Sequence, residues 1–116
     1  FNNGTTDVDL TGFSLQYASA TGATIASTQS LTGTIAAKGF FLLETGNAGS
    51  AGAALSSVVT PSQTGGTLNL AAAGGKVFLA NNAVTATFST GPDFGGNLSA
   101  NVIDAVGYGT ANAREG

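Results

Sequence analysis

Residues 13–17, FSLQY, alternate strictly between apolar and polar side chains. Successive side chains of an extended chain point to opposite faces, so Phe13, Leu15 and Tyr17 share one face and the two polar residues share the other. This period of two predicts a β-strand in which Phe13 and Leu15 contribute to a core. No stretch of the chain shows the period of an amphipathic helix, so this pattern decides the fold class.

Six further short runs predict strands, separated by clusters of Gly, Asn, Ser and Thr: 30–35, 39–44, 67–70, 76–80, 83–88 and 101–109. The run 39–44, GFFLLE, is almost continuously apolar, which is typical of a central strand buried on both faces, with Phe41 and Leu42 in the core. Asn81 and Asn82 predict a tight hairpin between 76–80 and 83–88, because Asn tolerates positive φ. About seven short strands favour an antiparallel β-sandwich over a small barrel.

The composition limits the function classes. The 116 residues predict a single domain, 1–116, with only three Lys and Arg against six Asp and Glu. That balance excludes a basic stripe, so nucleic acid is not an expected partner. No apolar run is long enough for a membrane-spanning helix, so membrane insertion is not expected either. The chain has no Cys and no His, which leaves no thiolate or imidazole chemistry, and we predict no cofactor and no enzyme activity.

Three aspartates are the candidates for chemistry. Asp7 and Asp9 point to the same side of an extended DVD segment and are candidate calcium ligands. A turn-forming role explains them better, because no third carboxylate lies nearby in the sequence. Asp104 lies within an apolar run, where strict alternation groups it with Val102 and Val106. Because no second acid or base accompanies Asp104, we predict a structural role for it, at a half-exposed edge or hydrogen-bonded in the interior.

Four segments together resemble the lamin-tail domain, in the copies found in exported bacterial proteins: 1–17 (FNNGTTDVDLTGFSLQY), 33–43 (GTIAAKGFFLL), 75–81 (GKVFLAN) and 102–109 (VIDAVGYG). The resemblance implies an immunoglobulin-like sandwich with no catalytic residues to carry over. It also implies that the family's first strand or strands, and possibly its last, lie outside this chain, with Phe1 and Asn2 ending the opening strand. Gly107 and Gly109 would then permit a bend or a close backbone approach at a corner of the sandwich, where Tyr108 caps the core.

The resemblance and the charge-poor surface lead to a functional expectation. We expect a non-catalytic attachment or protein-interaction module of a larger exported protein, located outside the cell or on a bacterial cell surface. Its partners would be other protein domains or copies of itself. The alternative is a structural subunit that assembles into a filament or surface layer by strand donation.

Overall fold

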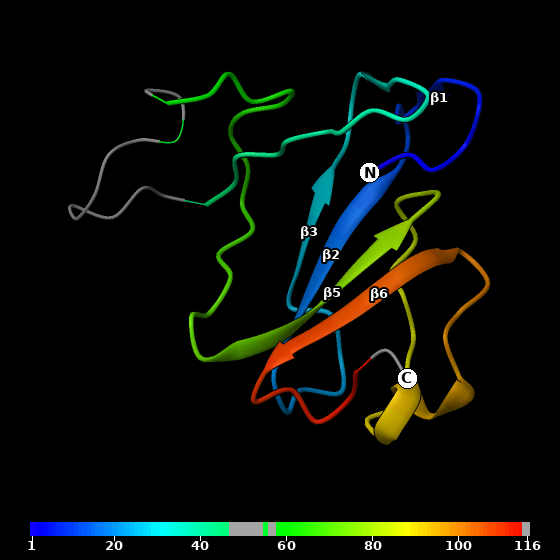
Figure 1. Ribbon diagram of the computed structural model, residues 1–116. Helices are drawn as coiled ribbons and strands as arrows, with labels where there is room; N and C mark the ends of the chain where they lie inside the picture. Colours follow the sequence, from blue (N-terminus) through cyan, green and yellow to red (C-terminus); the bar gives the residue numbers. More distant parts are fainter. Residues whose placement is uncertain (47–54, 56–57, 115–116) are drawn as a thin grey trace.

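The computed structural model describes residues 1–46, residue 55 and residues 58–114. Its elements, in chain order, are β1 (Val8–Asp9), β2 (Ser14–Ser19), β3 (Ser27–Ser30), β4 (Thr34–Ile35), β5 (Gly74–Ala80), the 3₁₀ helix η2 (Pro92–Gly96) and β6 (Val102–Gly109). Four strands form an antiparallel sheet in the order β3-β2-β5-β6, and β1 pairs with β4 in a second antiparallel sheet (Figure 1). The predicted all-β fold, an antiparallel β-sandwich, is confirmed; its likeness to immunoglobulin domains stays a prediction.

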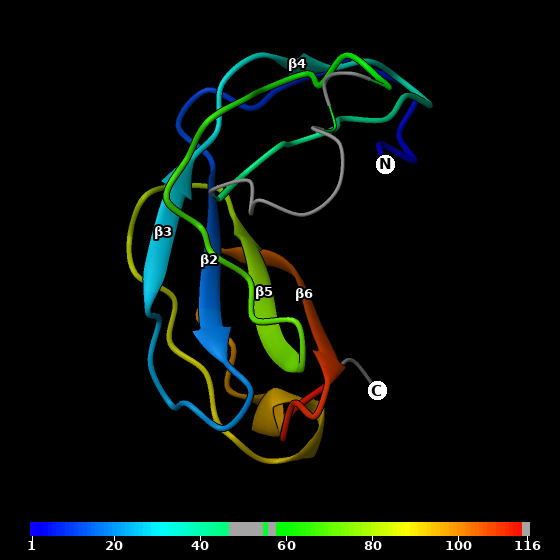
Figure 2. The ribbon, with the colours of Figure 1, turned by 90° about the vertical axis from the view of Figure 1, so that its left-hand side faces the viewer.

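Both faces of the four-stranded sheet carry a hydrophobic cluster. One cluster is built around Phe78, whose ring centroid lies 4.7 Å from that of Phe88 and 5.3 Å from that of Phe94. The other comprises Leu10, Leu31 and Ile35, with Phe13 and Leu15 packed against it. β4 and the N-terminus lie at one end of the four-stranded sheet, while η2 lies at the other end (Figure 2).

The predicted strand at 83–88 is wrong, and so is the hairpin at Asn81 and Asn82. β5 pairs with β2 and β6, and residues 83–88 belong to no strand. The reason lies in the buried polar side chains of β2. Gln16 donates from Nε2 to the Val84 carbonyl (2.9 Å) and accepts the Ala86 amide at Oε1 (2.8 Å). Hydrogen bonds from this side chain therefore hold residues 84–86, in place of backbone hydrogen bonds to a neighbouring strand.

The predicted strands at 39–44 and 67–70 are also wrong. Residues 39–44 make a single isolated bridge, in which Leu43 pairs with Gln63. Phe40 is 80% exposed, and Phe41 and Leu42 are only half-buried, so this run is not a central strand within the described residues. At 67–70 the Leu68 side chain is fully buried, yet the backbone joins no sheet, because apolar burial alone does not require a neighbouring strand.

Candidate interaction groove

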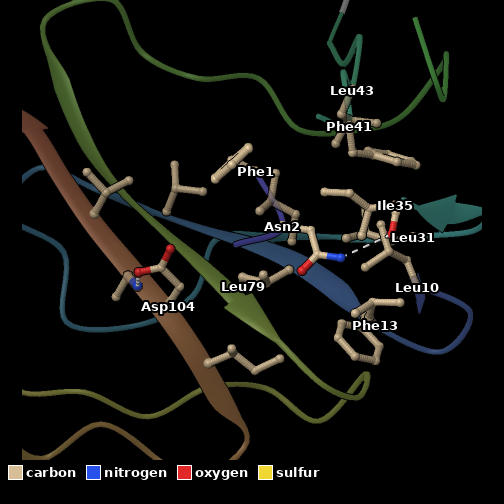
Figure 3. Close-up of a pocket in the computed structure, with 16 residues that line it drawn as sticks. Phe1, Asn2, Leu10, Phe13, Leu31, Ile35, Phe41, Leu43, Leu79 and Asp104 are labelled. Carbon is tan, nitrogen blue, oxygen red and sulfur yellow. Dashed lines mark hydrogen bonds between the residues drawn. The ribbon is translucent and has the colours of Figure 1, made fainter. Parts of the chain in front are cut away.

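An open groove lies on the face of the four-stranded sheet that carries Leu15. It has a volume of about 570 Å³ and is lined mainly by apolar side chains. β5 and β6 form its floor, Phe41 and Leu43 stand on the opposite side, and Phe1 and Asn2 lie between them (Figure 3). We call this feature the apolar groove.

The floor of the apolar groove follows from strand register. Val77 of β5 lies opposite Val106 of β6, and Leu79 lies opposite Asp104. Directly opposite residues project from the same face of a sheet, so these two cross-strand pairs all face the groove. Val106 remains 49% exposed, which leaves apolar surface open to solvent on this face.

A β-bulge changes which side chains at the start of β6 project toward the groove. The register of β5 against β6 shifts between Leu79 and Ala80, so that Ala80 pairs with Val102. Ile103 therefore lines the groove and is 54% exposed, while Val102 packs against the Phe78 cluster on the other face. The predicted shared face of Val102, Asp104 and Val106 is wrong for Val102, because strict alternation takes no account of the extra residue at a bulge.

The opposite wall is held by Asn2 and by residues 39–43. The Asn2 backbone amide donates to the Gly39 carbonyl (2.9 Å), and its side-chain Nδ2 donates to the carbonyls of Ile35 (3.3 Å) and Ala36 (3.2 Å). The Phe1 ring packs on that of Phe40 with a centroid distance of 4.8 Å. Asn2 thus fixes the N-terminal residues against the turn that precedes the wall.

Among the residues that the structure describes, Asp104 contributes the one carboxylate of the groove lining. Its side chain is exposed, and its Oδ1 accepts the backbone amide of Ala105 (2.9 Å). The carboxylate therefore lies at the outer edge of β6, opposite Phe41 and Leu43 across the groove (Figure 3). This position gives an otherwise apolar surface a negative charge at one side.

The two candidate calcium ligands lie outside the groove lining and bind backbone amides. Asp7 accepts the amide of Ala37 and Asp9 accepts that of Thr11, each at 2.8 Å. Hydrogen bonds from the Thr11 side chain and backbone hold the pKa of Asp9 below its ordinary value. In the described part of the chain, no three acidic side chains lie close enough together to hold a metal ion.

The Gly-Tyr-Gly corner is a point of close backbone contact. A Cβ atom on Gly107 would overlap the carbonyl oxygen of Ala113, and Gly109 has a positive φ of 59°. The Tyr108 hydroxyl donates to the Ala71 carbonyl (2.8 Å). Burial, and secondarily the neighbouring Tyr17, raises the pKa of Tyr108. The corner joins the end of β6 to the segment that enters β5.

We expect Gly107→Ala to lower the free energy of unfolding by about 1–3 kcal/mol, because the added methyl group has no space beside the Ala113 carbonyl. Urea denaturation followed by circular dichroism measures this change. Gly12→Ala is an unsuitable control because of its positive φ, whereas Ala100→Gly changes a single methyl group at an exposed turn. Equal stability of Gly107→Ala and the parent would show that the 111–114 segment moves aside at no cost.

The comparisons identify no relative for this chain. No protein-family model matches it, no curated protein matches it and no solved structure matches it. The likeness to lamin-tail domains therefore rests on the sequence motifs. Among the residues that the structure describes, none of the helices is both long and apolar enough for a membrane crossing.

Sequence reasoning identified Phe13, Leu15, Phe41 and Asp104, and all four line the groove. It placed Leu42 in the core, but Leu42 is half-buried beside the Ser62 hydroxyl, which accepts its amide (3.1 Å). The sequence analysis missed the groove itself. Alternation in the run 76–80 does place Val77 and Leu79 on one face, but it does not reveal that this face is open.

Proposed function

We propose that this chain is a non-catalytic protein-interaction module that attaches a larger exported protein to a partner at the cell surface. The observation that carries the proposal is the apolar groove, where Ile103 and Val106 expose apolar surface on the face of an ordered sheet. Contiguous exposed apolar surface of this kind is typical of interaction sites. The low share of charged residues, 8% of the chain, and the likeness to exported lamin-tail domains support a location outside the cell.

A fluorescent fusion of the chain, applied to intact cells of the producing organism, tests this proposal. We expect the parent fusion to be retained on the cells and Val106→Lys to reduce retention by about tenfold, since a lysine in the groove places a charge among apolar contacts. Val84→Lys is the matched control, because Val84 is 65% exposed and lies outside the groove. Equal retention of Val106→Lys and the parent would overturn the proposal.

The structural-subunit alternative uses the same surface. Exposed apolar residues on β6 would also serve contacts between copies of the chain. Sedimentation velocity over a range of concentrations separates the two functions: an attachment module stays monomeric, whereas a subunit that assembles by strand donation forms larger species that Val106→Lys abolishes.

A further inference from the structure

The wall of the apolar groove has one backbone side that pairs with none of the residues that the structure describes. Leu42 accepts the amides of Ser62 (2.8 Å) and Gln63 (3.2 Å), and the Glu44 amide donates to Gln63, so the even-numbered residues direct their backbone groups toward residues 62–63. In an extended segment alternate residues point to opposite sides, so Phe41 and Leu43 direct their backbone groups the other way. No described residue hydrogen-bonds the backbone of either.

This unpaired side is the one on which Asn2 lies. The Gly39 carbonyl, which shares its direction with the backbone groups of Phe41 and Leu43, accepts the Asn2 amide. The Asn2–Gly39 hydrogen bond is the single contact of a strand ladder that would continue along residues 41 and 43. Figure 3 shows Phe1 and Asn2 between this wall and the floor formed by β5 and β6. A strand that continued this ladder would therefore cover the groove.

The side chains define which strand fits. Alternate residues of such a strand would face Val77, Leu79 and Val106, so its inward positions should be apolar. The Asp104 carboxylate at the far side favours a lysine or arginine at one inward position. The exposed Phe40 ring, which packs only on Phe1 among the aromatic pairs, extends the apolar surface along the same wall.

A second copy of the chain is poorly suited to supply that cation. Lys76 is fully buried, and the Nζ of Lys38 donates to the Asn3 carbonyl (2.6 Å). Arg114 donates to the Gly109 carbonyl (2.9 Å). These are the three cationic side chains of the sequence. Lys38 and Arg114 are exposed, but each already donates to a carbonyl of its own chain, so a partner strand with a free lysine or arginine suits Asp104 better.

We propose that the apolar groove binds an extended strand of a partner protein, which pairs with the backbone of Phe41 and Leu43 and places a lysine or arginine against Asp104. The inference rests on the proposed interaction function and specifies its partner. Binding by strand addition supplies backbone hydrogen bonds for affinity and side-chain pockets for specificity.

The probe is a nine-residue peptide with valine at alternate positions, threonine between them and lysine in place of the central valine. Two matched probes accompany it: one with norleucine in place of lysine, and one with N-methylated valines, which cannot donate from those backbone nitrogens. Binding to the purified chain is measured by isothermal titration calorimetry. We expect the N-methylated peptide to bind at least about tenfold more weakly than the parent peptide, since it loses several backbone hydrogen bonds.

Variants of the chain locate the bound peptide. Asp104→Asn keeps an Oδ1 atom for the Ala105 amide, and we expect it to weaken the lysine peptide about tenfold while leaving the norleucine peptide unchanged within about twofold. Val106→Lys should weaken both peptides, and Val84→Lys should weaken neither. Circular dichroism establishes that each variant is folded; Val106 is 49% exposed and Asp104 is exposed, so neither replacement is at a buried position.

Several outcomes would overturn the inference. If the N-methylated peptide binds as tightly as the parent, the groove takes apolar groups without strand pairing. If the chain dimerises through the groove and Val106→Lys abolishes the dimer, the occupant is a second copy. If the peptide binds only when joined directly to Phe1, a separate partner is excluded. If no peptide binds although Val106→Lys still reduces retention on cells, the strand inference fails and the proposed function stands. If no peptide binds and Val106→Lys leaves retention unchanged, both the strand inference and the proposed function fail.

Discussion

Replacing Lys76 by alanine is expected to lower the free energy of unfolding by about 3–5 kcal/mol, although lysine is ordinarily a surface residue. The Lys76 side chain has no exposed surface. Its Nζ donates to the carbonyls of Ala20 (3.2 Å) and Gly22 (2.7 Å) and to Oδ1 of Asn112 (2.8 Å). It also lies 5.2 Å from the centroid of the Phe88 ring. Alanine would leave three acceptors without their donor and a cavity where the stem packed.

Two variants separate these contributions in urea denaturation experiments. Lys76→Met keeps most of the stem and removes the donors, so we expect a loss of about 2–3 kcal/mol. Lys38→Met removes a lysine from the exposed turn at residue 38, and we expect a change of less than about 1 kcal/mol. A loss below about 1 kcal/mol for Lys76→Ala would mean that water replaces the ammonium group at its three acceptors.

The pH dependence of stability gives a second readout of the Lys76 prediction. Burial lowers the pKa of Lys76, whereas the unfolded chain titrates near the ordinary lysine value of about 10.4. Between the two pKa values the unfolded state binds more protons, so the contribution of Lys76 to stability rises with pH in that window. Tyr108, whose pKa is raised, acts in the opposite direction above about pH 10. The difference between the parent and Lys76→Met cancels the tyrosine and should isolate the rise.

The strands that the sequence predicts well lie side by side in the four-stranded sheet. The predicted runs at 13–17, 76–80 and 101–109 correspond to β2, β5 and β6. Alternation between apolar and polar residues is strict only at 13–17, because both faces of this sheet carry a hydrophobic cluster. It predicts which side chains share a face, and it fails at the bulge beside Ile103, where one extra residue reverses the facing.

The wrongly predicted strands are segments whose sequence indicates apolar side chains but does not indicate which groups their backbone hydrogen-bonds. Residues 39–44 and 83–88 have apolar or alternating patterns, yet their backbone bonds go to side chains or to single bridges. The apolar groove could not be predicted for the same reason. Phe41 and Asp104 were identified singly, but their separation across the groove depends on how Asn2 holds residues 1–2 against Gly39, which no local pattern encodes.

The second large effect is expected for Gln16→Leu, which should lower the free energy of unfolding by about 3–5 kcal/mol. Gln16 has no exposed surface, although the alternation at 13–17 places it on the polar face. Its Nε2 donates to Val84 and to the Ser14 hydroxyl (3.0 Å), and its Oε1 accepts the Ala86 amide. The Ser14 hydroxyl in turn donates to the Asn82 carbonyl (2.6 Å). Leucine fills a similar volume but leaves buried polar groups of this network without partners.

Hydrogen exchange localises the effect of Gln16→Leu, because Oε1 of Gln16 is the acceptor for the Ala86 amide. We expect Ala86 to exchange much faster in this variant even where the rest of the sheet stays protected, since its acceptor is gone. Gln29→Leu is the matched control: Gln29 binds backbone groups at Gly65 (3.1 Å) and Thr67 (3.1 Å), but these hydrogen bonds are exposed, and we expect a loss of about 1 kcal/mol or less. Retained protection of Ala86 in Gln16→Leu would show that apolar packing, through Ala86 and Phe88, holds this segment on the sheet without the side-chain ladder.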